Sequence, residues 1–423
     1  MRVLIVNTSE RTGGAAVAAN RLMEALNNNG VKATMLVRDK ETEQLTVSAV
    51  PRSGHVNWHF LWERFVIWLH LHFRRQHLFE IDIANSGYDI TSLREFREAD
   101  VIHLHWVNQG MLSLKGIRRI LDSGKPVVWT MHDIWPATSV CHYARGCERF
   151  HTACACCPLL PEKSWADLAA HVWRQKVAML DGHRIHYVAC SRWLADEARQ
   201  SALLAGQKIA AIPNAIDTRL FSPQDKQCAR QQWELPTGKR VILFVSQRVT
   251  DERKGMSYFV KAVSLLAARY PAMREDTVIA ILGGHSEEVV SQLALPAYSL
   301  GYVSDPHRIV EVYNTADVFV LPSLEDNLPN TLMEAMACGV PCVGFRVGGI
   351  PEMIDHRQNG YVARFCDADD LAAGIRYVLD EADGHDLAYA CLQKVLHTYS
   401  QQSVAKRYIE IYEEALTLQS QQS

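Results

Sequence analysis

Short apolar runs alternate along the whole chain with polar loops and with segments whose apolar residues recur every three or four positions. Runs of four to eight apolar residues between turn signals predict strands buried on both faces of a parallel sheet. The three- and four-residue spacing predicts helices with one buried face. The predicted strands lie at 3–6, 32–37, 99–106, 126–131, 186–191, 209–212, 240–245, 278–282, 318–321 and 342–345. This alternation predicts an α/β protein.

The length of 423 residues exceeds a typical single core and fits two domains of roughly 200 residues each. A Phe-Ser-Pro turn at 221–223 predicts the linker. We therefore expect an N-terminal domain over 1–220 and a C-terminal domain over 224–400, each beginning with a Rossmann-like strand-loop-helix-strand pattern.

The composition is that of an ordinary globular protein, with 48% hydrophobic and 22% charged residues. The formal charge of −3 argues against a general nucleic-acid binder. No apolar run approaches the roughly 18 residues of a transmembrane helix, and the chain start does not resemble a signal peptide, so we expect a cytoplasmic protein. In that reducing compartment its 11 cysteines are expected to be thiols or metal ligands.

The strongest chemical signal lies at 316–349. The strand at 318–321 is followed by a polar loop and by a helix that starts near residue 330, so Asp326 precedes the helix and Glu334 lies on its first turns. Both carboxylates therefore lie at the carboxyl end of a parallel strand, where open α/β sheets bind ligands.

That arrangement suits a nucleotide sugar. Backbone N–H groups at the helix start can bind a diphosphate, helped by the helix dipole. Glu334 can accept both hydroxyls of a ribose, and Asp326 can reach hydroxyls of a second sugar. The alternative is that Glu334 caps its own helix and Asp326 is a solvated turn residue. The residues expected to bind the diphosphate are Leu328, Pro329, Asn330 and Thr331.

The segment 322–354, PSLEDNLPNTLMEAMACGVPCVGFRVGGIPEMI, resembles the donor-site motif of retaining glycosyltransferases of family 4, which have the GT-B fold. In that family two acidic residues, separated by seven others, precede EAMA-x-G-x-P. Asp326 and Glu334 match the pair, although the first acid is usually Glu. The resemblance implies two Rossmann-like domains that face each other across an interdomain cleft, with the last helix, at 401–418, packing back on the N-terminal domain.

The resemblance also extends to the N-terminal half. Gly13, Gly14 and Ala15 match a GGA turn that in the family lies near the donor phosphates. The alternative is that these residues allow tight packing of a helix on a strand. His132 ends the strand at 126–131 and matches a histidine that contacts the transferred sugar. His103 and His105 follow a recurrent pattern, in which one of the two is expected to be a core histidine.

In the C-terminal half, Arg248 and Lys254 match the family's Arg and Lys that bind the donor diphosphate, although Gln247 replaces the usual glycine. Cations at these positions stabilise the charge that builds on a leaving diphosphate. Arg253 is adjacent to Lys254 and could substitute for it. Because these two cations would neutralise the phosphate charge, the resemblance implies catalysis without a divalent cation.

A cysteine-rich loop follows His132. The five cysteines within 141–157 include Cys154 and Cys157, which form a C-x-x-C knuckle typical of half a tetrahedral zinc site. Cys141 and Cys147 could supply the other half, and Cys156 is expected to point away. The alternative is a loop packed by reduced thiols. An HD-x-W-P-x-T motif followed by such cysteines resembles bacterial surface-polysaccharide transferases.

The segment 55–79 is aromatic and basic, HVNWHFLWERFVIWLHLHFRRQHLF. We expect a helix packed into the N-terminal domain, with most of its aromatic side chains in the core. The alternative is peripheral contact with the inner membrane, apolar face down and cations toward anionic head groups.

The resemblance implies an enzyme that transfers a sugar, with retention, from a nucleoside-diphosphate sugar to a glycan or a lipid-linked acceptor. Two alternatives remain open: a catalytically weak sugar-nucleotide or glycan-binding member of a biosynthetic complex, and a sugar-nucleotide epimerase with the same fold. Hydrolysis of the donor without acceptor separates a transferase from a binding protein.

Overall fold

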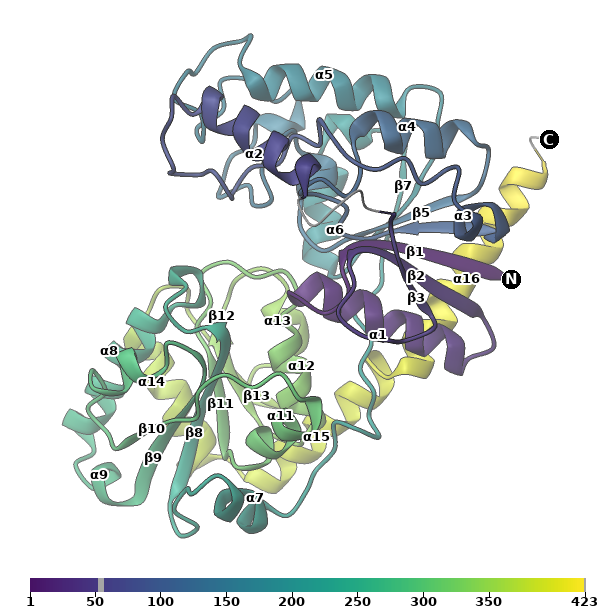
Figure 1. Cartoon of the computed structure of the whole chain (residues 1–423). Coiled ribbons are helices and arrows are strands. Elements are labelled where there is room, and N and C mark those ends of the chain that lie inside the picture. Colours follow the sequence, from purple (N-terminus) through teal and green to yellow (C-terminus); the bar gives the residue numbers. More distant parts are fainter. Residues whose placement is uncertain (52–56, 422–423) are drawn as a thin grey trace. The chain divides into compact units, whose positions relative to one another are not determined.

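The computed structural model describes residues 1–51 and 57–421 (Figure 1). These residues form two compact units. Unit 1 contains Met1–Ala215 and Val404–Ser423, and unit 2 contains Ile216–Ser403. The change of unit thus falls a few residues before the linker expected at 221–223.

Unit 1 is built on a seven-stranded sheet in the order β3-β2-β1-β4-β5-β6-β7, and all of its neighbouring strands are parallel. Its strands are β1 (Arg2–Ser9), β2 (Lys32–Asp39), β3 (Val47–Ala49), β4 (Val101–Leu104), β5 (Val127–Met131), β6 (His186–Ala189) and β7 (Lys208–Ala211). Its helices are α1 (Gly14–Asn28), α2 (Trp58–His70), α3 (Arg94–Glu98), α4 (Leu114–Asp122), α5 (Leu168–Leu180) and α6 (Arg192–Arg199), with 3-10 turns η1 (Trp135–Ala137), η2 (Arg149–His151) and η3 (Ala202–Leu204).

Unit 2 is built on a six-stranded parallel sheet in the order β10-β9-β8-β11-β12-β13. Its strands are β8 (Arg240–Arg248), β9 (Thr277–Gly284), β10 (Ala297–Ser299), β11 (Val318–Leu321), β12 (Cys342–Phe345) and β13 (Gly360–Ala363). Its helical elements are α7 (Lys226–Gln232), η4 (Glu252–Lys254), α8 (Met256–Arg269), α9 (Met273–Asp276), α10 (Glu287–Val290), α11 (Pro306–Asn314), α12 (Asn330–Ala337), α13 (Ile350–Met353), α14 (Ala368–Arg376), the π-helical turn η5 (Tyr377–Glu381) and α15 (Gly384–Thr398).

Both sheets are covered on both faces, as the apolar runs predict. In β1, Leu4 and Val6 belong to one core cluster, and Val3 and Ile5 belong to the cluster on the opposite face. Alternate side chains of a strand point to opposite faces, so a strand that is apolar at every position needs cover on both sides. The α/β prediction is therefore confirmed.

The last helix, α16 (Gln401–Ser420), belongs almost entirely to unit 1, and Figure 1 shows it along the sheet of that unit near α1. The hydroxyl of Tyr412 lies 2.7 Å from Nδ1 of His103, and the hydroxyl of Tyr408 lies 2.9 Å from Oγ1 of Thr130. Both tyrosine side chains are buried. The core of unit 1 is therefore complete only when the last helix of the chain packs on it.

Helix α2 reverses the expectation for the aromatic segment, whose first two residues, 55–56, lie outside the described residues. The buried positions of α2 are Glu63, Arg64 and Ile67, while Trp58, Trp62 and other large apolar side chains are exposed. The expectation that most of these aromatics form core is wrong. The reason is the segment 82–84 beside the helix. Its backbone N–H groups bond to Glu63 and the Asp82 carboxylate pairs with Arg64, so the charged side of α2 faces inward.

No helix in the described part of the chain combines the length and the hydropathy that crossing a bilayer requires.

Candidate functional site

The candidate donor site lies at the carboxyl edge of the unit 2 sheet. Strands β8, β11 and β12 are neighbours in that sheet, so the loops that follow them meet at one edge. Arg248 ends β8, Lys254 ends the 3-10 turn η4 six residues later, and Asp326 lies in the loop after β11. Residues distant in the sequence are thereby brought together.

The closest of these contacts is an ion pair. Lys254 Nζ donates to Asp326 Oδ2 at 2.6 Å, and Ser323 Oγ donates to the same oxygen at 2.9 Å. The Asp326 side chain is only 14% exposed, so it is not the solvated turn residue of the alternative interpretation. The ion pair links the loop after β8 to the loop after β11 and places a cation and an anion side by side.

Two glycines allow these loops to approach. A Cβ on Gly255 would lie 1.8 Å from the carbonyl oxygen of Pro322, and a Cβ on Gly348 would lie 1.7 Å from that of Asp326. Both glycines have positive φ, +71° and +54°, where other residues are strained. Any side chain at either position would push the loop that carries Asp326 out of place.

Glu334 lies inside helix α12, on its second turn. The residue that precedes the helix is Pro329, and no side chain caps the helix start, so Glu334 is not a helix cap. Glu334 is buried, and its Oε2 accepts a hydrogen bond of 2.8 Å from the hydroxyl of Tyr313 on α11. That bond fixes the carboxylate at one oxygen.

The amino end of α12 is the predicted diphosphate-binding segment. Leu328 and Pro329 are buried, whereas Asn330 and Thr331 are partly exposed. The carbonyl of Asn327, one residue earlier, accepts from the N–H of Gly349 at 2.8 Å. The segment is therefore held against the loop after β12, with the first turn of α12 at its end.

Arg248 is exposed and its Nε donates to Thr250 Oγ1 at 3.2 Å. Arg253 instead pairs with Asp251, two residues earlier, at 2.7 Å. Of the two adjacent cations, Lys254 is the one that contacts Asp326, and Arg253 is held by a carboxylate of its own turn.

In unit 1, His132 follows β5 and lies at the carboxyl edge of that sheet. Its Nε2 is 2.9 Å from Nδ1 of His105, which follows β4, and its Nδ1 is 3.4 Å from Sγ of Cys190, which follows β6. Burial lowers the pKa of His132 to about 4, although Asp133 opposes the shift. His132 is therefore neutral at neutral pH. His103 is the core histidine of the pair expected from the sequence, since Thr130 and Tyr412 bond both of its ring nitrogens.

A network around His142, which the sequence pattern did not predict, holds this edge. His142 lies between two carboxylates, with Nε2 2.5 Å from Asp82 and Nδ1 2.7 Å from Asp133. Burial alone would lower its pKa, but Asp133 and Asp82 raise the pKa of His142 to about 10. Asp133 also accepts from the indole of Trp106 at 3.0 Å. The "HD" dipeptide was the available signal, because an aspartate next to a strand-end histidine needs a partner.

Gly13 is the residue before α1, and Gly14 and Ala15 begin that helix. Gly14 is exposed, and a Cβ added to Gly13 would touch nothing within 4 Å. Tight packing of helix on strand therefore does not explain Gly13. The phosphate-binding role of these three residues stays a prediction.

The cysteines of the 141–157 loop meet around one cavity of about 160 Å³. Lys176, on α5, contacts one residue of the cavity wall, because its Nζ donates to the carbonyl of Thr138 at 3.0 Å; it also donates to that of Trp135, outside the lining, at 2.6 Å. Among the described residues, no three His, Cys, Asp or Glu side chains stand at the mutual distances of metal ligands. The cysteines that line the cavity are Cys141, Cys147, Cys154 and Cys157, without Cys156.

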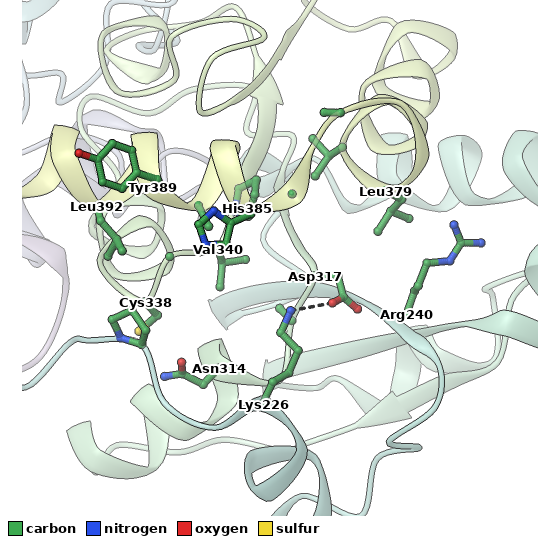
Figure 2. A pocket seen from close by; sticks show the side chains of 18 of the residues that line it. Lys226, Arg240, Asn314, Asp317, Cys338, Val340, Leu379, His385, Tyr389 and Leu392 are labelled. Atoms are coloured by element: carbon green, nitrogen blue, oxygen red, sulfur yellow. Dashed lines mark hydrogen bonds and ion pairs between the residues drawn. The ribbon is translucent and has the colours of Figure 1, made fainter.

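Another cavity, of about 510 Å³, lies in unit 2 (Figure 2). Its lining includes Arg240, Asp317 and Pro341, which begin or immediately precede β8, β11 and β12. It is therefore at the amino edge of the sheet, opposite to the edge that carries Lys254. Figure 2 shows the ion pair of Lys226 with Asp317 across it, at 2.8 Å. This cavity is distinct from the candidate donor site.

Solved structures share the fold over almost the whole chain. Sucrose-phosphate synthase from Thermosynechococcus elongatus superposes with a TM-score of 0.67, 18% identity and 99% of both chains covered. Anabaena HepE, solved in complex with UDP-glucose, gives a TM-score of 0.65 with 16% identity, over 98% of this chain and 100% of that one. The fold is GT-B, with its two Rossmann-like parallel sheets.

Curated relatives match more locally. D-inositol 3-phosphate glycosyltransferase 2 of Catenulispora acidiphila is 30% identical over 184 residues, which are 41% of this chain and 43% of that protein. N-acetyl-alpha-D-glucosaminyl L-malate synthase of Bacillus anthracis is 24% identical over 216 residues, 49% of this chain and 54% of that protein. The chain thus spans about half the length of the curated relatives it matches, and neither name concerns surface polysaccharides.

Two family models match successive parts of the chain. The model described as Glycosyltransferase Family 4 matches residues 12–220, and the model described as Glycosyl transferases group 1 matches residues 239–381. The first falls on unit 1 and its junction with unit 2, and the second contains Arg248, Lys254, Asp326 and Glu334. The chain belongs to the glycosyltransferases of group 1 and family 4.

Proposed function

We propose that the chain transfers a sugar from a nucleoside-diphosphate sugar to an acceptor hydroxyl with retention at the anomeric carbon. The observation that carries this proposal is the Lys254–Asp326 ion pair at the carboxyl edge of the unit 2 sheet, one loop away from the start of α12. A cation, a carboxylate and a helix start at such an edge suit a diphosphate with a sugar attached.

In this proposal the Glu334 carboxylate, which Tyr313 holds by a hydrogen bond, binds the ribose. Lys254 and Arg248 stabilise the leaving diphosphate, and Asp326 and His132 position the transferred sugar. The bond between the anomeric carbon and the diphosphate oxygen breaks, and a bond to the acceptor oxygen forms on the same face. The acceptor proton passes to the departing phosphate, whose charge the protein's own cations meet, so that the transfer needs no divalent cation.

The donor is proposed to carry a uridine or similar nucleoside diphosphate, with support from the complexes of Anabaena HepE with UDP and UDP-glucose. For the acceptor we propose a glycan or a lipid-linked sugar of a bacterial surface polysaccharide, on the resemblance of the loop after His132. The named curated relatives support a smaller acceptor, an inositol phosphate or malate. An acceptor panel that holds all three classes decides between them.

The experiment for the transfer itself compares Lys254→Ala with Arg253→Ala. Loss of Lys254 is expected to lower kcat for donor hydrolysis roughly 100-fold, because the charge it meets grows in the transition state. Arg253→Ala, the matched control on the same turn, is expected to leave kcat near wild type. Equal losses in both variants would assign the diphosphate to Arg253 as well. If the wild type binds the donor but does not hydrolyse it, the chain is a sugar-nucleotide-binding protein. If it interconverts donor sugars, it is an epimerase.

We further propose that Cys141, Cys147, Cys154 and Cys157 hold a structural zinc ion. Four thiolates form a donor set typical of structural zinc, and all four line the same cavity. Lys176 supports the assignment, because a tetrathiolate zinc carries negative charge and this buried side chain, which also lies over the Trp135 ring at 3.3 Å, would supply a positive charge nearby. The thiols would have to close in across the cavity to bind the ion.

A further inference from the structure

Helix α2 has one polar and one apolar face, but it buries the polar face, whereas a helix that packs on a core buries its apolar face. Its only two residues with full charges, Glu63 and Arg64, are buried, and its largest apolar side chains are exposed. A surface helix normally buries its apolar face and presents its charged face to water. The exposed face of α2 therefore requires its own explanation.

The buried polar side chains of α2 are bonded to unit 1 through Glu63 Oε1 and both terminal nitrogens of Arg64, while Glu63 Oε2 and Arg64 Nε have no hydrogen-bond partner among the described residues. Glu63 Oε1 accepts from the backbone N–H groups of Ile83 and Ala84 at 2.9 and 2.7 Å. Arg64 pairs with Asp82 and donates to the carbonyl of Leu78 at 2.7 Å. These bonds fix the rotation of the helix about its axis, and they hold the apolar face outward.

That face is one continuous stripe. Its members follow helical spacing, at positions i, i+3, i+4, i+7 and i+11, and the rings of Trp62 and Phe65 are 6.0 Å apart. The aromatic contacts continue from Phe65 to Trp68 at 6.3 Å and from Trp68 to Phe73 at 4.8 Å. The exposed stripe consists of Trp58, Leu61, Trp62, Phe65 and Leu69, with Trp58 67% exposed.

The charges at the end of the stripe are basic. Arg74 and Arg75, four and five residues after the end of α2, are exposed, while no acidic residue lies on the exposed face of the helix. The nearby acids each contact a basic residue: Glu80 lies 2.9 Å from His77 and 2.8 Å from Arg145, and Glu162 lies 3.5 Å from His72. The last pair brings the loop with Trp165, 80% exposed, close to the end of α2.

We propose that the exposed face of α2 docks unit 1 on the surface of a bilayer that contains anionic lipid. Helix α2 has 13 residues, too few to span the hydrocarbon core, so it would lie in the interface plane. Trp and Phe rings suit that depth, and Arg74 and Arg75 would meet anionic head groups. A protein partner would need a complementary acidic rim, and the basic end favours lipid phosphate. This surface belongs to unit 1, whereas the candidate donor site belongs to unit 2.

The test is co-sedimentation with vesicles of phosphatidylcholine alone and of phosphatidylcholine mixed with phosphatidylglycerol. The wild type is expected to bind the mixed vesicles more tightly. Removing three large apolar side chains in Trp62→Ser/Phe65→Ser/Leu69→Ser is expected to weaken the partition roughly 100-fold on either vesicle. Arg74→Gln/Arg75→Gln is expected to lose about fivefold per charge on mixed vesicles only.

The matched control is Tyr389→Ser/Leu396→Ser, which removes two exposed apolar side chains from α15 in unit 2. This variant is expected to bind vesicles as the wild type does. Unfolding temperatures check the fold, and if the triple variant is destabilised, Trp58→Ser alone replaces it with about a fivefold loss.

Three outcomes overturn the proposal. The wild type could fail to bind either vesicle, or the triple variant could bind as tightly as the wild type. In the third outcome, the wild type does not bind vesicles and sediments as a dimer, while the triple variant sediments as a monomer. That result would assign the stripe to an interface between two copies of the chain.

Discussion

At the scale of single residues, the two acids of the donor motif are held in different ways. Asp326 is paired with Lys254 and Ser323, whereas Glu334 has a hydrogen bond from the Tyr313 hydroxyl and lies inside a helix. The partner of Asp326 is a cation, which a phosphate would also attract, whereas the partner of Glu334 is a neutral hydroxyl. Glu334 therefore suits tight binding of a ribose, and Asp326 suits contacts that change as the leaving group departs.

Glu334→Gln tests the ribose assignment. Replacing a carboxylate acceptor with an amide is expected to weaken donor binding by about 1.5–3 kcal/mol for each charge-assisted bond lost. Titration calorimetry with the nucleoside diphosphate measures the change, and Glu325→Gln, next to Asp326 but off the motif's register, is the control. Equal affinity of the Glu334 variant and the wild type would refute the assignment.

His142 gives a prediction with a defined pH dependence. Its pKa is raised from 6.5 to about 10, so its stabilisation is complete below pH 6.5 and is lost as the pH rises toward 10. Near pH 6, His142→Asn is expected to lower the free energy of unfolding by about 3–5 kcal/mol, because Asp82 and Asp133 lose a buried counter-charge.

The measurement is urea denaturation of both proteins at several pH values from 6 to 9.5. The difference between variant and wild type is expected to shrink steadily over that range, since groups common to both proteins cancel. A difference that stays constant would mean that His142 is neutral in the folded protein.

At the scale of elements, the cysteine loop packs against α5 and comes after β5 and His132 in the chain. Because structural zinc contributes folding free energy directly, Cys154→Ser and Cys157→Ser are expected to lower the unfolding temperature and the donor hydrolysis rate together. Cys156→Ser is the matched control, since Cys156 does not line the cavity.

Elemental analysis of the purified chain, followed by chelation, measures the metal itself. About one zinc per chain is expected, and its removal should reproduce the effect of the cysteine variants. Less than about 0.2 zinc per chain after metal-free handling, with full stability, would identify the four residues as packed thiols.

At the scale of the whole molecule, unit 1 depends on both ends of the chain. Tyr408 and Tyr412 of α16 are buried against β4 and β5, next to a core that α1 also covers. A chain that ends at residue 400 is expected to lose these contacts and to leave His103 Nδ1 unbonded.

Differential scanning calorimetry of the full and the shortened chain tests this dependence. Most of the Trp residues lie in unit 1, so a thermal scan of tryptophan fluorescence identifies which calorimetric transition belongs to that unit. That transition is expected to move to lower temperature in the shortened chain. Tyr412→Phe is expected to shift the transition less in the same direction, because it lowers the free energy of unfolding by about 1–3 kcal/mol. An unchanged transition after truncation would show that unit 1 folds without its last helix.

Most of the fold was predictable from the sequence because a strand covered on both faces must be apolar at consecutive positions. The runs at 3–6, 240–245 and 318–321 all became strands of the two sheets. Strands β3, β10 and β13 were missed, since these edge strands have only three or four residues each.

The sequence by itself determined the α/β class, the donor motif with its two acids and the cysteine knuckle, because each depends on local spacing. Only the tertiary structure decided the contacts between distant segments: Lys254 with Asp326, and His142 between Asp82 and Asp133. It also decided which face of α2 is buried. Hydrophobicity alone favours the aromatic face, but the unpaired backbone and carboxylate beside the helix require its two charged residues, and a buried polar group without a partner costs more than an exposed ring.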